Sequence, residues 1–439
     1  MHHVQYLKQA QMMREMATLS KFSEDMMGNI LSRLPPKSLM RFRCVLKSWH
    51  DLIDKPSFVD QHLSTAMDNK VTSSTYVLLK HNVLTDPGIK DDEKAVRATL
   101  FNPDSNQRDI LLSSLNLCSL VDDGLEIENH VVPPPMRGYA LSLEISGSCD
   151  GLICLNTFNS EDIVLCNPAL EEYRVLPKSC ILLPPRVPRQ FEENEDDDYY
   201  EEDDDDEIES NPKCVGFGYD PNSKDYKVVR AAQFVSGVFT QHPSKVEVYS
   251  LAADTWREIP VDIQPHGSLN PSYQMYFKGF FYWIAYWTEE RNVILSFDMS
   301  EEVFHDIALP ESGPDAYEYT SIAVWKDSLV LLTYPVENEA PKTLDLWVLD
   351  EDLKGAKGLW TKHLAIGPLE KGVEAPLLFW KDEELLMVTT NGDVVNYSLD
   401  TQKLKHVPRH GLGEPTNIQA VPYVNSIVSI QPGNKIESI

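Results

Sequence analysis

Residues 294–310, with the sequence ILSFDMSEEVFHDIALP, carry the pattern that decides the fold of this chain. A short apolar run, a turn rich in Ser and Glu, and a second run that ends at a proline are typical of a β-hairpin. The same arrangement recurs at residues 165–177, 246–260 and 394–408, and residues 346–360 carry a copy with a longer turn and no proline. Because this hairpin is repeated, we expect a mainly β fold.

A second hairpin precedes each of these, with polar turns at residues 150–151, 220–222, 278–279, 326–327 and 381–382. The last three turns are roughly 50 residues apart, and two hairpins make four strands. Four-stranded units at this spacing are typical of β-propeller blades, which bury both faces only by stacking around a ring. With a degenerate blade near residues 76–112 we expect about six blades, and a strand within residues 421–430 that closes the ring.

The first part of the chain follows a helical period instead. Ser23 is suited to cap a helix, and apolar residues follow it at the spacing i, i+3, i+4, i+7. The pair Pro35-Pro36 ends this helix and begins another, and a third is expected around Trp49. Three helices of this size bury too little surface to be stable alone, so their apolar faces predict a partner protein. The alternative is a small helical cap that belongs to the larger domain.

The run from Ile30 to Val45, followed by Lys47-Ser48-Trp49 and Pro56-Ser57-Phe58, closely resembles the F-box of plant F-box proteins. The resemblance implies that this module docks on a Skp-type adaptor and, through it, on a cullin ubiquitin ligase. The sequence departs from the family at Met26-Met27, where branched aliphatic residues are usual, and we expect weaker adaptor affinity because Met specifies geometry poorly. The residues that match adaptor-contacting positions of the family are Ile30, Leu31, Leu34, Pro35, Leu39, Val45 and Trp49.

The body of the chain carries a second resemblance. Residues 216–221, 225–230 and 246–251 look like the F-box-associated domain of plant substrate receptors. Residues 36–64 and 178–185 are similar to the S-locus F-box proteins, especially those of the apple and pear group. This implies a non-catalytic receptor whose target is a non-self S-RNase, in the cytosol of pollen tubes, during self-incompatibility. An F-box receptor for a different stress or developmental target is the alternative.

The resemblance and the patterns together predict an organisation in three parts, the last of which contains an insertion. A flexible N-terminal segment covers residues 1–21, and the F-box module covers residues 22–66. A kelch-like β-propeller covers residues 70–435 and contains an acidic loop insertion at residues 189–212.

The chain is strongly acidic, with 39 Lys and Arg against 68 Asp and Glu and a formal net charge of −29. This balance argues against nucleic acid and against anionic membrane surfaces as partners, and it favours a basic protein target. Much of the charge lies in residues 192–209, a block that cannot bury itself and is expected to be mobile. The candidate residues for attracting the target are Glu192, Asp196, Glu201, Asp204 and Glu207.

The seven cysteines form an odd set, and the chain shows neither an export signal nor a membrane span, so we expect reduced thiols in the cytoplasm. No His and Cys spacing fits a zinc site, and we expect no metal and no cofactor.

Three further motifs have residue types that could support catalysis or ligand binding. Residues 147–151, Gly-Ser-Cys-Asp-Gly, have the outline of a nucleophile elbow, but Asp150-Gly151 is a strong hairpin signal and a strand-like run follows it. Gly216 and Gly218 lack the third glycine of a dinucleotide loop. The aromatic cluster Tyr282, Trp283, Tyr286 and Trp287 could form a sugar platform or an interface, although a core strand is favoured. A propeller lectin or enzyme with an incidental helical cap therefore stays as the last alternative.

Overall fold

A computed structural model describes residues 23–68, 75–83, 95–101, 113–118, 143–157, 162–181, 208–236, 240–241, 244–260, 268–286, 292–310, 318–335, 342–350, 359–407 and 418–431. The predicted flexible segment at residues 1–21 lies outside the described residues.

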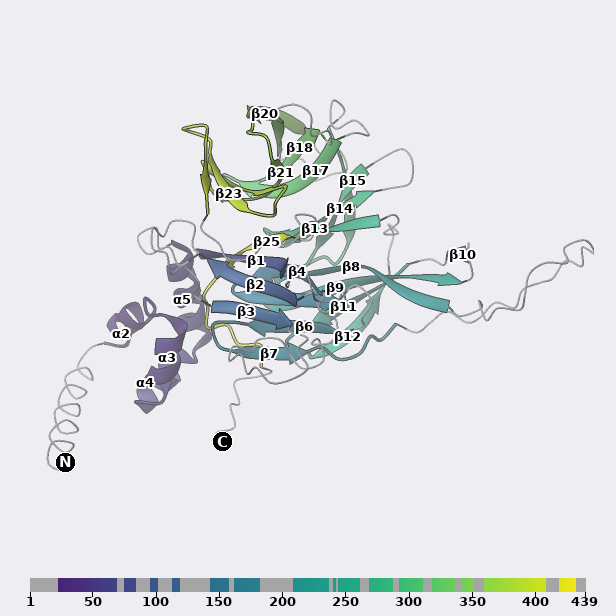
Figure 1. The fold of residues 1–439 in the computed structure, drawn as a ribbon. Helices are drawn as coiled ribbons and strands as arrows, with labels where there is room; N and C mark the ends of the chain where they lie inside the picture. Colours follow the sequence, from purple (N-terminus) through teal and green to yellow (C-terminus); the bar gives the residue numbers. More distant parts are fainter. Residues whose placement is uncertain are drawn as a thin grey trace, which may run out of the picture.

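Helices form a module at the start of the described chain, drawn in purple in Figure 1. They are α2 (Glu24–Leu31), α3 (Pro36–Arg43), α4 (Lys47–Ile53) and α5 (Pro56–Asp68). The sequence predicted three helices within residues 22–66, and the structure corrects this to four. Pro56 begins the additional helix, because proline is accommodated in a first turn where its missing N–H costs no hydrogen bond.

The rest of the described chain folds into six antiparallel sheets, which agrees with the expected mainly β architecture of about six blades. Blade 1 consists of β25 (Gln419–Val424), β1 (Thr75–Val83), β2 (Ala95–Phe101) and β3 (Ser113–Cys118), and blade 2 of β4 (Leu143–Cys149), β5 (Leu152–Thr157), β6 (Ile163–Asn167) and β7 (Glu172–Val175). Blade 3 consists of β8 (Ile208–Asp220), β9 (Asp225–Ser236), β10 (Thr240–Gln241), β11 (Lys245–Ser250) and β12 (Thr255–Ile259). Blade 4 consists of β13 (Ser268–Phe277), β14 (Phe280–Tyr286), β15 (Asn292–Asp298) and β16 (Phe304–Ala308). Blade 5 consists of β17 (Glu318–Trp325), β18 (Ser328–Pro335), β19 (Leu344–Leu349) and β20 (Trp360–Ile366), and blade 6 of β21 (Val373–Lys381), β22 (Glu384–Thr389), β23 (Val394–Ser398) and β24 (Lys403–His406).

The first strands of the blades contact one another in sequence: β4 contacts β8, β8 contacts β13, β13 contacts β17, and β17 contacts β21. Strand β21 then contacts β25, and β25 contacts β4, which completes the ring. Strand β25 comes from the end of the described chain and pairs antiparallel with β1, with Tyr423 opposite Tyr76. The predicted closure is therefore confirmed, although the strand ends at Val424 and residues 425–430 continue outside it.

The predicted hairpins are all present. The pairs β6–β7, β11–β12, β15–β16, β19–β20 and β23–β24 correspond to the five repeated hairpins, and the turn at Asp150-Gly151 joins β4 to β5. Asp150 and Gly151 both have positive φ, of 53° and 82°, as a tight hairpin turn requires. Because a strand follows this turn where an elbow would need a helix, residues 147–151 do not form a nucleophile elbow.

The expected acidic loop is shorter than residues 189–212. Residues 208–212 belong to β8, which pairs with β9 from Ile208 opposite Ser236 onward. The long β9 offers backbone hydrogen-bond partners there, and Glu209 is the only acidic residue among these five. The five candidate acids between Glu192 and Glu207 lie outside the described residues.

Glycines in β8 allow blades 3 and 4 to approach each other. A Cβ at Gly218 would lie 2.2 Å from a ring carbon of Tyr276, and one at Gly216 would lie 2.5 Å from the ring of Trp283. Trp283 is fully buried and Tyr282 nearly so, which places both in the core between blades. The interpretation of Tyr282 and Trp283 as residues of a core strand is therefore correct. The side chains of Tyr286 and Trp287 lie outside the described ones.

Candidate functional site

Helix α2 presents two apolar side chains to solvent. Its N-terminus is capped by the Ser23 hydroxyl, which accepts a hydrogen bond from Met26 N, and the opposite face buries Met27 and Leu31. Met26 and Ile30 are each 48 % exposed, which is unusual for side chains of this size. A surface of this kind marks a site for a protein partner more often than an isolated exposed apolar residue does.

The turn after α2 extends this surface. Pro35 is exposed and Leu34 is partly buried, and the Nε2–H of His62 in α5 donates a hydrogen bond to the Leu34 carbonyl at 3.1 Å. The His62 side chain is buried, and desolvation by burial lowers its pKa. A neutral imidazole in α5 therefore fixes the backbone of the turn that carries Leu34 and Pro35.

Helices α3 and α4 hold the remaining predicted residues. Leu39 has no exposed surface, whereas Val45 and Trp49 are partly exposed. The rings of Phe42 and Trp49 lie 5.4 Å apart between centroids. The Arg43 guanidinium pairs with Asp54 at 2.8 Å and fastens α3 to the end of α4.

The structure divides the seven residues that the sequence matched to the adaptor site. Ile30, Leu34, Pro35, Val45 and Trp49 reach the surface of the module. Leu31 and Leu39 lie instead in its core and support this surface from beneath. Met26 was not among the predicted residues, and its exposure one turn before Ile30 adds it to the same surface. We call Met26, Ile30, Leu34, Pro35, Val45 and Trp49 the module surface.

The module contacts one end of the propeller. Leu170, in the turn between β6 and β7, packs against the helical core, and Lys37 Nζ lies 2.9 Å from Glu171 Oε1 in the same turn. Adjacent strands of a blade run in opposite directions, so the turns between first and second strands and between third and fourth strands lie at this end of the propeller. The links between second and third strands, and from one blade to the next, lie at the opposite end. We call these ends the module end and the far end of the propeller.

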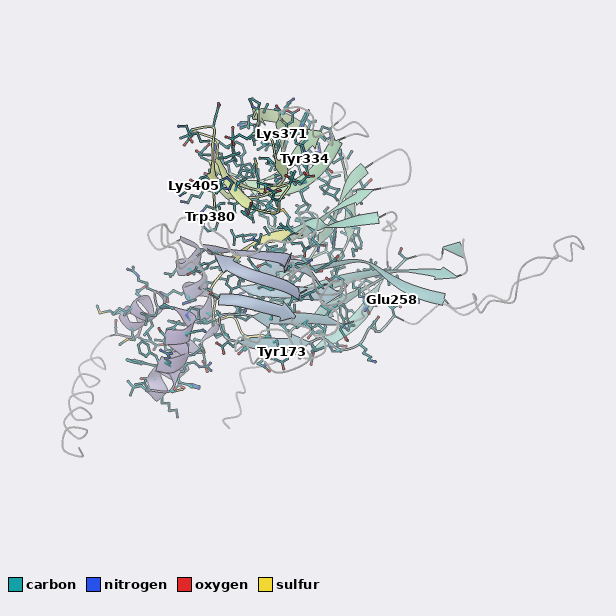
Figure 2. All side chains as sticks on the ribbon, in the orientation of Figure 1. Tyr173, Glu258, Tyr334, Lys371, Trp380 and Lys405 are labelled. Atoms are coloured by element: carbon teal, nitrogen blue, oxygen red, sulfur yellow. The ribbon has the colours of Figure 1, made fainter. Side chains whose placement is uncertain are left out.

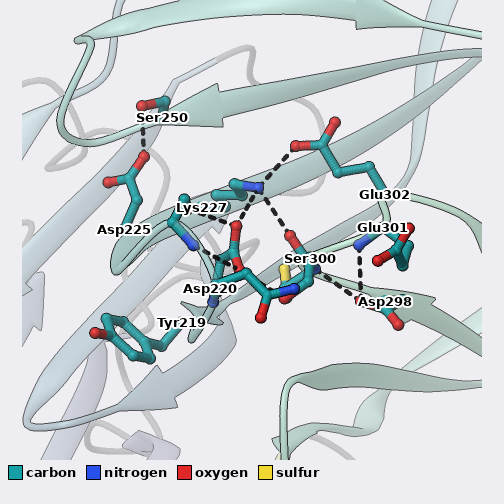
Figure 3. A network of polar contacts seen from close by, with 12 residues as sticks. Tyr219, Asp220, Asp225, Lys227, Ser250, Asp298, Ser300, Glu301 and Glu302 are labelled. Atoms are coloured by element: carbon teal, nitrogen blue, oxygen red, sulfur yellow. Dashed lines mark hydrogen bonds and ion pairs between the residues drawn. The ribbon is translucent and has the colours of Figure 1, made fainter.

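Figure 3 shows a polar network at the module end between blades 3 and 4. Lys227 Nζ lies 2.6 Å from Asp220 Oδ2 and 2.8 Å from Glu302 Oε1. The hydroxyl of Ser300 in blade 4 donates to Asp220 at 2.5 Å. Burial alone would raise the pKa of the Asp220 carboxyl, but the hydrogen bonds from Lys227, Ser223 and Ser300 hold it well below its usual range. This network joins two blades.

A hollow of about 270 Å³ lies between blades 5 and 6 and is lined by Trp325, Lys326, His363 and Glu383. Trp325 is nearly buried, and its Nε1–H donates to the Asp382 carbonyl at 2.5 Å. Lys326 covers the Trp325 ring at 4.4 Å and pairs with Glu383 at 3.0 Å. The polar groups of this hollow therefore already connect the two blades. Figure 2 shows the described side chains of the helices and the blades as sticks on the ribbon.

Within the part of the chain that the structure describes, no group of three His, Cys, Asp or Glu residues is placed to hold a metal ion. No described helix has the length and apolar character needed to cross a membrane. Cys149, the central residue of the supposed elbow, is buried, and burial together with Asp150 raises the pKa of its thiol well above the ordinary value.

Known proteins resemble this chain in structure or in sequence. Among solved structures, TolB from Acinetobacter baumannii aligns with a TM-score of 0.42 at 9 % identity, covering 82 % of this chain and 70 % of that one. The F-box protein CPR1 of Arabidopsis thaliana is 26 % identical over 412 residues, which cover 87 % of this chain and 82 % of that protein. An F-box/kelch-repeat protein of the same plant is 26 % identical over 361 residues, with 80 % and 81 % covered.

Two family models match the chain. The model of the F-box domain matches residues 19–61, which include α2, α3, α4 and the first part of α5. The model of the F-box associated beta propeller domain matches residues 105–430, which is well over half of the chain. The chain belongs to the plant F-box proteins that carry an F-box-associated β-propeller domain.

Proposed function

We propose that this chain is the substrate-recognition subunit of an SCF-type cullin ubiquitin ligase. The module surface binds a Skp-type adaptor, and the propeller binds a protein target. The observation that carries the proposal is the exposure of Met26 and Ile30, both 48 % exposed, on one face of a capped helix beside Pro35. Apolar side chains held in solvent by a rigid helix gain about 25 cal/mol for each Å² that a partner covers.

Each predicted adaptor residue has a definite role in this proposal. Ile30 and Pro35 contact the adaptor directly, with Leu34, Val45 and Trp49 at the margin of the contact. Leu31 and Leu39 act from the core, because a cavity there would displace α2 and α3.

The target is proposed to bind at the far end of the propeller. The helical module occupies the module end, through Leu170 and Glu171. Val175 and Ile208 lie at the far-end termini of β7 and β8, and the acidic stretch of the sequence connects these two strands. A target with a basic surface suits both this stretch and the net charge of −29.

The finer proposal for the target rests on the resemblance of residues 36–64 and 178–185 to S-locus F-box proteins. S-RNases are generally basic by that family's properties, so they suit the charge of this chain. In this proposal the receptor acts in the cytosol of pollen tubes. It has no catalytic residues of its own, because holding the target near the ligase is sufficient to accelerate ubiquitin transfer.

The adaptor side is tested with a surface variant. Ile30→Asp places a charge on the module surface and should reduce adaptor affinity at least a hundredfold in calorimetry. Leu359→Asp is the matched control, because Leu359 is 58 % exposed on the propeller and its replacement should leave affinity unchanged. Unchanged adaptor binding by Ile30→Asp, or by a Leu34→Ala/Pro35→Ala double variant, would reject the proposal. A full chain that binds no adaptor would favour a propeller lectin or enzyme with a helical cap.

The target side is tested by capture. The full chain with its adaptor is used to retain proteins from pistil extract, and mass spectrometry identifies them. Enrichment of a basic ribonuclease, sensitive to ionic strength, supports the S-locus proposal. Enrichment of other proteins only, or transcripts outside pollen, would support a receptor for a stress or developmental target instead.

A further inference from the structure

The core of the helical module is completed by a residue from the other end of the described chain. Ile427, which follows β25, is 5 % exposed and packs in one cluster with Met27, Leu31 and Phe58. Leu170 of blade 2 packs against the same cluster. The helices therefore do not form a separate core joined to the propeller by a linker.

The packing is also reciprocal. Val59 of α5 packs against a propeller cluster that contains Val428 and Ile430. Consecutive side chains after β25 thus pack in opposite directions: Ile427 lies in the helical core, and Val428 lies in the propeller core. A segment that contributes to both cores ties them together more directly than a surface contact would.

Residues 425–431 are in turn held on blade 2 by hydrogen bonds. The Asn167 side chain, which has no exposed surface, donates from Nδ2 to the carbonyls of Ser426 at 3.2 Å and Val428 at 2.7 Å. The Ser426 hydroxyl donates to the Asp150 carbonyl at 2.5 Å. Gly151 is needed for this approach, because a Cβ there would lie 2.5 Å from the Val424 carbonyl oxygen.

Further along, the last described residues bind β7. Arg174 Nη1 donates to the Ile430 carbonyl at 3.2 Å, and the amide of Ile430 donates to Glu172 Oε2 at 3.2 Å. The ion pair between Lys37 and Glu171 crosses the same junction, but both side chains are about two-thirds exposed, and pairs of this kind contribute little. The buried apolar contacts and the hydrogen bonds of the segment therefore carry the junction.

We propose that residues 425–431 are a brace that fixes the helical module to the propeller as one rigid body, with Ile427 and Leu170 as positioning residues. The proposal rests on the proposed function only for its consequence: a target at the far end is held at a set distance and orientation from an adaptor on the module surface. Ubiquitin transfer by proximity depends on such geometry, because motion at a hinge dilutes the reacting groups.

The rigidity can be measured on the full chain, without a target. Spin labels are placed on Cys44, which is exposed at the end of α3, and on Glu258→Cys, at an exposed position of β12. Cys180→Ser removes the other described exposed thiol. Double electron–electron resonance should give one narrow distance distribution, whether or not adaptor is bound.

The brace is then weakened. Ile427→Ala should widen the distribution at least twofold, whereas Ile427→Leu should leave it narrow. Ile259→Ala is the matched control, because Ile259 is equally apolar and buried but lies in blade 3, in a cluster without helical residues. Both alanine variants should lower the melting temperature. Only Ile427→Ala should also widen the distance distribution, because only Ile427 positions the helical module.

A second variant keeps the result decisive if Ile427→Ala fails to fold. Insertion of Gly-Gly-Ser between Val424 and Asn425 leaves β25 in place but uncouples the segment, and it should also widen the distribution. Narrow distributions in every folded variant, or a broad one in the unchanged chain, would overturn the brace. If the unchanged chain binds no adaptor but the brace variants widen the distance distribution as expected, the proposed function is rejected and the brace is supported.

Discussion

The ammonium group of Lys326 in blade 5 lies 3.0 Å from Glu383 Oε1 in blade 6, so the first turn of one blade is paired with the first turn of the next. One blade earlier, Lys278 Nζ lies 3.1 Å from Asp327 Oδ2 in the same relation. Between blades 3 and 4 the ion pair joins different positions, Lys227 in strand β9 and Glu302 in the turn between β15 and β16, and it is largely buried. The ion pairs between blades therefore differ in burial, and we expect them to differ in energy.

Replacing Lys227 by Met should destabilise the protein by about 3–5 kcal/mol, because it leaves the buried carboxylate of Asp220 without its cation. The same substitution at Lys326 should change stability by less than about 1 kcal/mol, because that pair is exposed. Urea unfolding of the two variants makes the comparison. Equal losses would show that burial does not decide the strength of these contacts.

The network at Asp220 also predicts a dependence on pH. The pKa of Asp220 is held well below its unfolded value of about 3.9, so its contribution is complete above that pH and is lost as the pH falls below it. Thermal melting from pH 5 down to pH 2 should therefore show a steeper loss in the unchanged chain than in Lys227→Met. Parallel curves would contradict this assignment.

His62 predicts a second, milder dependence. Burial lowers its pKa, so the folded protein binds this proton less readily than the unfolded chain, and stability declines as the pH falls below about 6.5. His62→Gln keeps a donor for the Leu34 carbonyl, and its melting temperature should depend less on pH between pH 7.5 and pH 5.5 than that of the unchanged chain. His50→Gln, at an exposed position of α4, should keep the slope of the unchanged chain. If the His50 variant loses the slope instead, His62 is not the responsible group.

Leu39 and Ile30 should separate stability from binding. Leu39→Ala opens a cavity in the helical core and should cost about 2–5 kcal/mol, measured by urea unfolding. Ile30→Ala should leave unfolding almost unchanged, because the side chain is half exposed, while it lowers the affinity for the adaptor. A loss of stability in both variants would place Ile30 in the core.

Ring closure predicts a sharp boundary in truncations. Deletion of residues 418–439 removes β25 and leaves β1 with an unpaired edge, so the protein should aggregate or lose its cooperative melt. Deletion of residues 432–439 alone should leave the melt unchanged, because β25 and Ile427 remain. Cooperative melting after the longer deletion would mean that the ring is stable without this strand.

Local chemistry in the sequence predicted most of the fold. Asp150-Gly151 identified a hairpin because its turn geometry is set by two adjacent residues. The helices followed from their periodicity, except α5, which begins after only two intervening residues, Asp54 and Lys55, and which the periodicity did not distinguish as a helix of its own.

Contacts between distant segments could not be predicted in this way. Ile427 stands in an apolar run that is equally suited to a strand, and only the folded ring shows that it enters the helical core. Similarly, Gly218 is explained by the ring of Tyr276, which lies in another blade. No local period signals either relation.

Strand β25 has a consequence for how the protein is made. Blade 1 requires strands from both ends of the ring, and the ribosome synthesises all the other blades between β3 and β25. Until Ile427 emerges, the helical core also lacks its last side chain. A nascent or prematurely terminated chain thus has neither a closed ring nor a finished module, so both parts of the fold are completed only after β25 and Ile427 have been synthesised.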